Sequence, residues 1–479
     1  MDQKTKTFIR NFTKALKEKN AAIFAGAGLS RESGFVDWRG LLKHIAEELH
    51  LDVDKEQDLV ALTQFHINEK GGNRGSINQM LIDEFTKDFI TTENHKILAS
   101  LPIDTFWTTN YDHLIEDTLK DEGKTPDVKI QPNNLAVSLP KRDAIVYKMH
   151  GDISQPSEVV ICKDDYELYN LKRHLFSTAL QGDLVSKTFL FIGFSFNDPN
   201  LDQILSRIRL LLGENQREHY CFFKKIHRDD CRDDEEFQYN KVKQELKIKD
   251  LKRYSIEGIF VDDYPEITEI LVRIRNSYKR NTVFISGSAD DYGKFGENVS
   301  LEFIHALSKR LLSDDYKIIS GFGRGVGSTV INGCLDYIYS SKYRHLDEYL
   351  ELRPFPQVIT GGKAKGSLWK EYRQDMISNA GIAIFIFGNK MNEKREIVDA
   401  TGVIEEFEIA KAYGLQLIPV GATGFVSKTL WEIVMKEYDS LYPDYPSLKT
   451  DFELLAKEDE NPNSLIVTIL KIVNAIRGG

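Results

Sequence analysis

Cysteine is scarce in this chain, and the few cysteines are not paired. The 479 residues contain four, Cys162, Cys221, Cys231 and Cys334, with no CxxC spacing among them. Structural zinc sites use closely spaced cysteine pairs, and disulfide scaffolds are small and cysteine-dense. The sequence therefore predicts no metal site and no disulfide framework, which fits the reducing cytoplasm.

Long apolar runs and an excess of positive charge are also missing. The longest apolar run, "TFLFIGFSF", is far too short to span a bilayer, and the charged N-terminus does not look like a signal peptide. Lys and Arg number 63 against 73 Asp and Glu, a net charge of −10. This balance argues against nucleic-acid and anionic-membrane partners. We therefore expect a cytoplasmic protein that binds neither.

The chain is long enough for two or more domains, and its first half alternates strand-like and helix-like segments. An amphipathic helix is predicted over 4–19 and a helix-rich stretch over 39–100, while the charged stretch 213–258 is predicted to form peripheral helices and loops. Strands are predicted at 21–25, 104–109, 144–149 and 188–194. Strands separated by helices indicate an α/β fold with a parallel, doubly wound sheet.

The pattern restarts near residue 280. The segment "EITEILVRIRNSYKR" is typical of a helix that ends a domain, and "NTVFISGS" then begins a new strand and glycine turn. Four more apolar segments follow, "YKIISGFGRGVGS", "ELRPFPQVIT", "IAIFIFGN" and "LQLIPVGATG", each separated by a helix-like stretch. We therefore expect two Rossmann-like domains, 1–278 and 281–479.

The stretch "AAIFAGAGLS", residues 21–30, reads as a buried strand that ends in a glycine turn at Ala25, Gly26 and Gly28. Glycines allow backbone N–H groups to approach a phosphate, and Ser30 would cap the next helix or bind that phosphate. An ordinary tight turn between a strand and a helix is the alternative.

Two further predicted strands are followed by polar residues that could take part in binding or catalysis. In "TTNYDHLIE", the Asn110 amide can hold a ribose hydroxyl or a water, and Asp112 lies two residues later. In "YKMHGD", His150 can accept a proton near neutral pH. The alternatives are an Asx turn at Asn110 and a structural role for His150.

The fourth polar segment is "FIGFSFNDPNL", which follows a very apolar strand. Its small and polar residues would allow a nucleoside to approach the backbone, although the same residue types favour a plain turn. The candidates in this segment are Gly193, Ser195, Asn197 and Asp198.

Together and in this order, the four segments resemble the GAGxS, TQN-D, HGD and GTS motifs of the SIR2 family, over roughly residues 5–275. The resemblance implies a fold that binds NAD+ as a substrate, without a prosthetic group, at the residues named above. It also implies that Asn110 and His150 are the catalytic pair, and we expect the two side chains to converge on one ribose. Asp112 matches the aspartate that contacts the nicotinamide amide.

Two departures from the sirtuin pattern concern the acyl-lysine substrate. The four-cysteine zinc ribbon of the deacetylases is missing, and Trp38 stands in "RESGFVDWRG" where their SGIPDFR motif has Phe. What remains is cleavage of the nicotinamide–ribose bond, in which the leaving group is already cationic. We therefore expect an NAD+ hydrolase, with a sirtuin-type deacylase or a non-catalytic NAD or ADP-ribose sensor as alternatives.

The second half carries its own glycine turns, "VFISGS" and "IISGFGRGVGSTVING", the latter leading into a helix near Ser328. It resembles the SLOG family over roughly 281–479, but "DATGVIEEFEIA" lacks the paired glycines of the PGGxGTxxE motif found in hydrolytic members. The resemblance therefore implies ligand binding rather than catalysis, and an active nucleotide hydrolase is the alternative. The candidate residues are Gly287, Ser288, Gly321, Phe322, Gly323, Arg324, Arg373, Lys390, Gly402 and Glu406.

A SIR2-like domain followed by a SLOG-like domain is similar to the effectors of Thoeris anti-phage defence. That resemblance implies that a partner with a TIR domain makes a cyclic ADP-ribose isomer on infection. The isomer binds the SLOG domain, and the SIR2 domain then depletes cellular NAD+. It further implies a homo-oligomer, a tetramer, assembled through the SIR2 domains.

Overall fold

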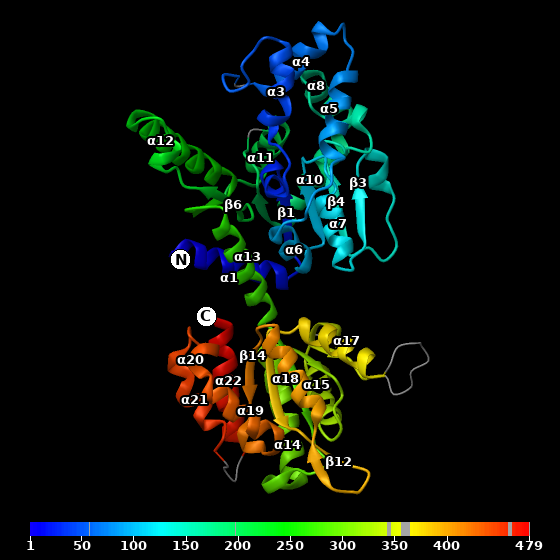
Figure 1. The fold of residues 1–479 in the computed structure, drawn as a ribbon, viewed down its shortest axis with the longest axis vertical. Coiled ribbons are helices and arrows are strands. Elements are labelled where there is room, and N and C mark those ends of the chain that lie inside the picture. The colour runs from blue at the N-terminus through cyan, green and yellow to red at the C-terminus, as the bar shows by residue number, and fades with distance from the viewer. Residues whose placement is uncertain (57, 197, 343–345, 356–364, 458–461, 479) are drawn as a thin grey trace. The chain divides into compact units, whose positions relative to one another are not determined.

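The chain forms two compact units, Met1–Arg275 and Asn276–Gly479, which are described separately (Figure 1). The structure is a computed structural model, and it describes residues 1–56, 58–196, 198–342, 346–355, 365–457 and 462–478. Both units are built on parallel sheets, as the alternation of strands and helices predicts.

The first unit contains a sheet of seven parallel strands in the order β3-β4-β2-β1-β5-β6-β7. The strands are β1 (Ala21–Ala25), β2 (Thr105–Thr108), β3 (Pro126–Lys129), β4 (Ala144–Lys148), β5 (Thr188–Ile192), β6 (His219–Lys224) and β7 (Ile256–Val261). Every residue of β1 and β5 is buried. Strands covered on both faces consist of continuous apolar residues, which is why both were visible in the sequence.

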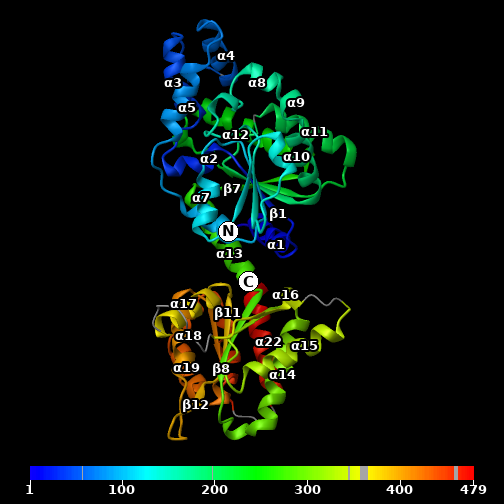
Figure 2. The same ribbon diagram turned by 90° about the vertical axis from the view of Figure 1, so that its right-hand side faces the viewer.

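Helices cover both faces of this sheet, with α7 on one side and α10 and α11 on the other (Figure 2). The Asp2 side chain accepts from the Thr5 N–H at 2.8 Å and so begins the first helix. The helices that begin in this unit are α1 (Gln3–Lys17), α2 (Ala27–Ser30), α3 (Trp38–Glu48), α4 (Leu59–Glu69), α5 (Gly75–Phe85), α6 (Glu93–Ser100), α7 (Leu114–Asp121), α8 (Lys163–Glu167), α9 (Tyr169–Lys172), α10 (His174–Ser186), α11 (Pro199–Leu212), α12 (Asp234–Leu251) and α13 (Pro265–Lys279), and the last of these continues past Arg275 into the second unit.

The prediction that residues 213–258 form only peripheral helices and loops is wrong. Strand β6 lies inside this stretch and pairs with β5 and β7, so it is an interior strand of the sheet. Its first four residues are buried, but charged residues flank it on both sides. Six residues were too few to stand out against that charge.

The second unit contains a sheet of five parallel strands in the order β10-β9-β8-β11-β14, and a separate antiparallel pair, β12 with β13. The strands are β8 (Thr282–Ser288), β9 (Lys317–Ser320), β10 (Leu350–Leu352), β11 (Ile382–Phe387), β12 (Asn389–Met391), β13 (Ile397–Asp399) and β14 (Gln416–Pro419). Within the predicted segment 351–360, only Glu351 and Leu352 belong to a strand, and residues 356–360 lie outside the described ranges.

Helices α14, α15 and α22 cover one face of the second sheet, and α17, α18 and α19 cover the other (Figure 2). The helices of this unit are α14 (Gly296–Ser313), α15 (Gly327–Ser340), α16 (Leu346–Tyr349), α17 (Lys365–Ser378), α18 (Thr401–Ala412), α19 (Phe425–Lys436), α20 (Tyr438–Leu441), α21 (Lys449–Leu454) and α22 (Asn463–Gly478). Among the residues that the structure describes, no helix of either unit has the length and apolar character needed to cross a bilayer.

Candidate active site and candidate ligand site

The glycine turn after β1 lies against the turn after β5, where the strand order of the first sheet reverses. Ligands of open parallel sheets bind at such a reversal. Gly26 N–H donates to Ile192 O and Gly28 N–H donates to Gly193 O, both at 2.9 Å. A Cβ added at Gly193 would lie 2.1 Å from the Leu29 nitrogen. The glycines are therefore required because two backbones touch, and the two N–H groups expected to face a pyrophosphate are already bonded within the protein.

Ser30, Asn110 and Asp112 form one hydrogen-bonded group beside this turn. Asn110 Nδ2 donates to Gly26 O at 3.1 Å and to Ser30 Oγ at 3.0 Å, and Ser30 Oγ donates to Asp112 Oδ2 at 2.8 Å. All three side chains are buried. The expectation that Ser30 caps the following helix is wrong, because Ser30 is the last residue of α2 and its hydroxyl bonds to a side chain from another loop.

Further hydrogen bonds, made by the Thr108 hydroxyl and by backbone N–H groups, hold Asn110 and Asp112 in place. Thr108 Oγ1 donates to Ala25 O at 3.0 Å and accepts from Asn110 N–H at 2.9 Å. Asp112 Oδ1 accepts from Leu114 N–H at 3.0 Å, so this carboxylate satisfies the start of α7 while its other oxygen serves Ser30. The amide and the carboxylate are thus held rigidly at the end of β2.

His150 lies beside Asp198, which comes from the loop after β5. Its Nε2 is 3.0 Å from Asp198 Oδ2, a contact distance without hydrogen-bond alignment, and the two side chains are 3% and 7% exposed. Asp198 also accepts from the N–H groups of Asn200 and Leu201 at the start of α11. Burial alone would raise the pKa of Asp198, but His150 and these N–H groups hold it below its usual value.

Tyr166 contacts both members of the His150–Asp198 pair. The ring of Tyr166 meets the imidazole of His150 edge to face at 5.6 Å, and its hydroxyl lies 3.4 Å from Asp198 Oδ2. Burial raises the pKa of Tyr166, so the phenol stays protonated and can only donate to the carboxylate. Sequence reasoning missed Tyr166, because nothing near it in the chain marks it as a neighbour of His150.

The two candidate catalytic residues follow adjacent strands in matching positions. Thr108 pairs with Lys148 in the sheet, so Asn110 and His150 each stand two residues beyond a paired position. Asn110 contacts the β1 loop and His150 contacts the β5 loop, at the same edge of the sheet. Their convergence on one sugar stays a prediction. Ser195 is exposed on the β5 loop, and Asn197 lies outside the described residues.

Beneath these loops lies a cluster of titratable side chains that sequence reasoning did not single out, in which Glu116 and Asp152 are buried and His113 is half exposed. His113, Glu116 and Asp152 place ligand-type atoms within 4.8 Å of one another. The ammonium of Lys148 pairs with both Glu116 and Asp152, so the protein itself supplies the cation. Nearby, buried Arg173 donates to Ile130 O at 2.9 Å and to Glu158 O at 2.8 Å. A lysine within an apolar strand was the available signal for this cluster.

In the second unit, the glycine turns after β8 and β9 also touch through their backbones. Ala289 N–H donates to Arg324 O at 2.9 Å, and a Cβ added at Gly323 would lie 1.9 Å from Gly287 O. Between these contacts, Phe322 has a φ of +58° and is 51% exposed. A bulky residue held in the left-handed region, with its ring in solvent, is a costly arrangement in a ligand-free loop.

Arg373 of α17 is the centre of a second group of predicted residues. Its Nη1 donates to Glu405 Oε2 at 2.7 Å and its Nε donates to Glu406 Oε1 at 3.3 Å. Glu406 also accepts from Ser286 Oγ at 2.6 Å, and burial raises the pKa of Glu406. Gly402 leaves room for the guanidinium, since a Cβ there would lie 2.8 Å from Arg373 Nη2.

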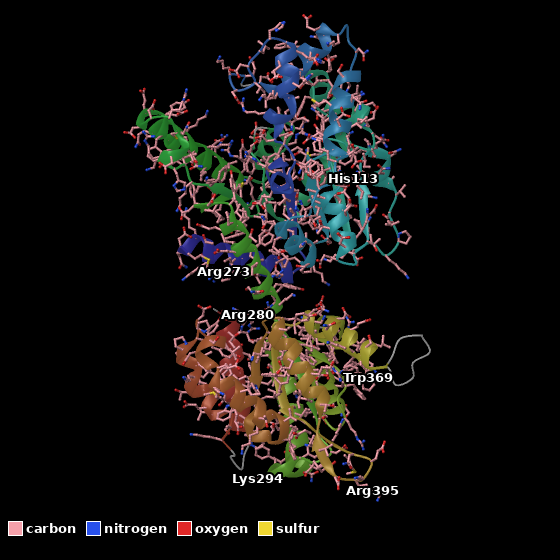
Figure 3. All side chains as sticks on the ribbon, viewed as in Figure 1. His113, Arg273, Arg280, Lys294, Trp369 and Arg395 are labelled. Carbon is pink, nitrogen blue, oxygen red and sulfur yellow. The ribbon has the colours of Figure 1, made fainter. Side chains whose placement is uncertain are left out.

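Aromatic rings complete this group. The guanidinium carbon of Arg373 lies 4.8 Å from the ring centre of Phe355 and 5.9 Å from that of Trp369, which is labelled in Figure 3. A Cβ at Gly321 would meet the Phe355 ring at 3.0 Å, so the glycine turn after β9 reaches the Arg373 group.

Three predicted residues of this unit, Ser288, Lys390 and Arg324, lie near β12 rather than near Arg373. Ser288 Oγ donates to Asn389 O at 2.9 Å, which places it beside exposed Lys390 of β12. Arg324 is 75% exposed in its side chain and pairs with Asp290 at 2.8 Å, beside an open hollow of about 410 Å³ lined in part by Tyr292. Among the described residues, no hydrogen bond or ion pair joins Lys390 or Arg324 directly to Arg373.

The two units define a protein with a SIR2-like fold followed by a SLOG-type fold. The family model "SIR2-like domain" matches residues 104–249, and the model "Sir2- and TIR-associating SLOG family" matches residues 266–476.

Relatives along nearly the whole chain define the family more narrowly. The chain is 54% identical to "NAD(+) hydrolase ThsA" of Cytobacillus dafuensis over 480 residues, covering 98% of this chain and 96% of that protein. It is 51% identical to the protein of the same name from Bacillus cereus (strain MSX-D12), covering 98% of each, and 45% identical to that from Acinetobacter baumannii (strain 532279), covering 99% and 100%. The chain belongs to the ThsA family.

Proposed function

We propose that the first unit hydrolyses NAD+ to nicotinamide and ADP-ribose. The observation that supports this proposal is that the Ser30–Asn110–Asp112 group and the His150–Asp198 pair both lie at the strand ends of the edge where the order of the parallel sheet reverses. The ThsA relatives named NAD(+) hydrolase support the choice of substrate.

The reaction does not need a general acid to protonate the leaving group. The pyridinium of NAD+ already carries positive charge, so the nicotinamide–ribose bond breaks with its electron pair returning to the ring nitrogen, and neutral nicotinamide leaves. Water then forms a bond to the ribose carbon and loses one proton. We assign that proton to His150, with Asp198 stabilising the resulting imidazolium, and we assign the orientation of the ribose or the water to Asn110.

The test is nicotinamide release from NAD+, followed by chromatography, with His150→Ala and Asn110→Ala as variants. Both variants are expected to remain folded and to lose at least 100-fold in turnover. Asn110→Ala should also lower the melting temperature, because it removes two buried hydrogen bonds. His44→Ala is the matched control, since His44 is an exposed histidine on α3 that pairs only with the neighbouring Glu48 in the described structure. Full turnover by a folded His150→Ala protein would refute the assignment.

We further propose that the second unit binds a cyclic ADP-ribose isomer and that binding activates the first. Arg373 offers a cation for phosphate, and the exposed ring of Phe322 offers a face for the adenine. Titration calorimetry with cyclic ADP-ribose isomers should show binding to the wild-type protein and a loss of at least tenfold in Arg373→Ala. Nicotinamide release should rise on adding the isomer to the wild type only.

We propose that a TIR-domain protein makes the isomer during phage infection and that the response depletes cytoplasmic NAD+. The description "Sir2- and TIR-associating" of the matching family model supports the TIR partner. Cells that express this chain with a TIR partner should lose NAD+ on infection, and cells carrying His150→Ala should not.

We also propose a tetramer assembled through the first unit. Leu210 and Leu211 at the end of α11 are 81% and 77% exposed, which is unusual for two neighbouring leucines on a free surface. Light scattering should give four times the mass of one chain, and Leu210→Ser with Leu211→Ser should lower it. An unchanged mass would place the interface elsewhere.

A further inference from the structure

A buried lysine lies beneath both candidate catalytic loops. Lys148 is the last residue of β4, and its side chain has no exposed surface. An ammonium in such a place is costly unless oxygen atoms surround it. Lys148 has four, and they come from separate segments of the first unit.

The partners of Lys148 tie the two loops together. Its Nζ donates to the main-chain oxygens of Tyr111, at 3.2 Å, and of Asp112, which follow Asn110 in the chain. It also pairs with Glu116 Oε1 on α7 at 2.9 Å and with the carboxylate of Asp152, which follows His150. An ammonium has three N–H donors, and the oxygens of Tyr111, Asp112 and Glu116 accept all three, so Lys148 has no proton to offer a substrate.

The charges around Lys148 keep it protonated. Burial would lower the pKa of Lys148, but the carboxylates of Glu116, Asp152 and Asp112 outweigh that effect and raise it. On the outer side, His113 Nε2 lies 3.0 Å from Asp152 Oδ1, and His113, labelled in Figure 3, is half exposed. The ammonium is therefore a permanent cation between carboxylates.

We propose that Lys148 is a positioning residue that holds the loop Asn110–Asp112 in register with the loop His150–Asp152. This inference rests on the proposed function, in which Asn110 and His150 act on the same sugar. Without the ammonium, two carbonyl oxygens and two carboxylates face one another with no cation between them. Their repulsion separates the loops and moves the carboxamide of Asn110 away from the imidazole of His150.

The test compares three variants of the full chain. Lys148→Met removes the ammonium at nearly constant volume, but it leaves the buried carboxylates of Glu116 and Asp152 without this cation and can prevent folding. The double variant Lys148→Met, Glu116→Gln also removes one carboxylate, while Asp152 keeps His113 and the Ser154 N–H at 2.8 Å. The matched control is Lys129→Met, because Lys129 ends neighbouring β3, is 4% exposed, pairs with Asp127 at 2.8 Å and bonds to Val137 O.

Two measurements decide the outcome. Hydrogen–deuterium exchange should rise at least tenfold in both peptides that carry residues 110–114 and 150–154 of the double variant, and not in Lys129→Met. In nicotinamide release, kcat should fall at least 100-fold in the double variant while KM stays within about threefold. Unchanged exchange in either loop, or a kcat within threefold of the wild type, would overturn the inference.

The exchange measurement separates this inference from the proposed function. A wild-type protein that releases no nicotinamide, with or without cyclic ADP-ribose isomers, refutes the proposed function. In that case exchange in the two loops still decides whether Lys148 holds them together.

Discussion

Replacing Gly193 by alanine should damage both the stability and the activity of the first unit. The added Cβ would lie 2.1 Å from Leu29 N, 2.6 Å from Gly28 C and 2.9 Å from Gly28 Cα, all of them backbone atoms that cannot rotate away. Gly193 also has a φ of +64°. An L-residue in that region costs about 1–2 kcal/mol, and overpacking costs about 1–3 kcal/mol.

Together these effects predict a loss of about 2–5 kcal/mol. For a unit of this size the melting temperature should fall by roughly 4–20 °C. Because the clash pushes the β1 turn from the β5 turn, and a displacement of about 1 Å can cost about 100-fold in rate, nicotinamide release should fall by about that factor.

The assay pairs tryptophan fluorescence melting with nicotinamide release. Gly182→Ala is the control, since Gly182 lies in α10 with a helical backbone and nothing within 4 Å of an added Cβ. That substitution should stabilise by about 0.5–1 kcal/mol and leave turnover unchanged. A Gly193→Ala protein as stable and active as the wild type would refute the reasoning that the two turns touch.

Three further changes test separate parts of the structure. Asp198→Asn keeps the side-chain oxygen that accepts from the first N–H groups of α11, but it removes the negative charge beside His150. Nicotinamide release should therefore fall roughly 100-fold at an unchanged melting temperature. Near-normal turnover would show that the imidazole does not depend on this carboxylate. Phe322→Gly relieves the backbone strain of a φ of +58° and removes a ring that is 51% exposed, so the melting temperature should not fall. Calorimetry should show that the free energy of binding a cyclic ADP-ribose isomer weakens by about 1–3 kcal/mol. Unchanged affinity would exclude stacking on this ring. The hydrogen bond that His113 donates to the Asp152 carboxylate raises the pKa of His113. The contribution of this bond to folding is present below about pH 6.5 and is lost as pH rises through the raised value. His113→Gln should therefore lower the melting temperature more at pH 6 than at pH 9, and equal losses at both would contradict this.

Those parts of the site that follow strand ends could be predicted from the sequence. Gly26, Asn110, His150 and Asp198 each come after an apolar strand, and the carboxyl ends of parallel strands meet at one edge. The α/β fold follows from the same alternation of buried strands and helices. Strand β6 was missed because its six residues lie within a charged stretch.

The partners of each side chain could not be predicted, because they come from distant parts of the chain. Ser30 bonds to Asp112 across 82 residues, and its hydroxyl gives no sign of this in the local sequence. The pairing of Lys148 with Glu116 likewise depends on how α7 lies against β4. The N–H groups of Gly26 and Gly28 were assigned to a phosphate, because the contact between the β1 and β5 turns is visible only in three dimensions.

The ion pairs of Arg373 bear on how the second unit would select its ligand. With Glu405 and Glu406 already beside the guanidinium, its positive field is largely cancelled before any ligand arrives. Abundant cellular anions such as ATP would gain little long-range attraction, and association would proceed at an ordinary rate that depends weakly on salt. Only a molecule that replaces the carboxylates with several well-placed groups at once would bind, so the arginine would respond to the shape of a nucleotide more than to its charge.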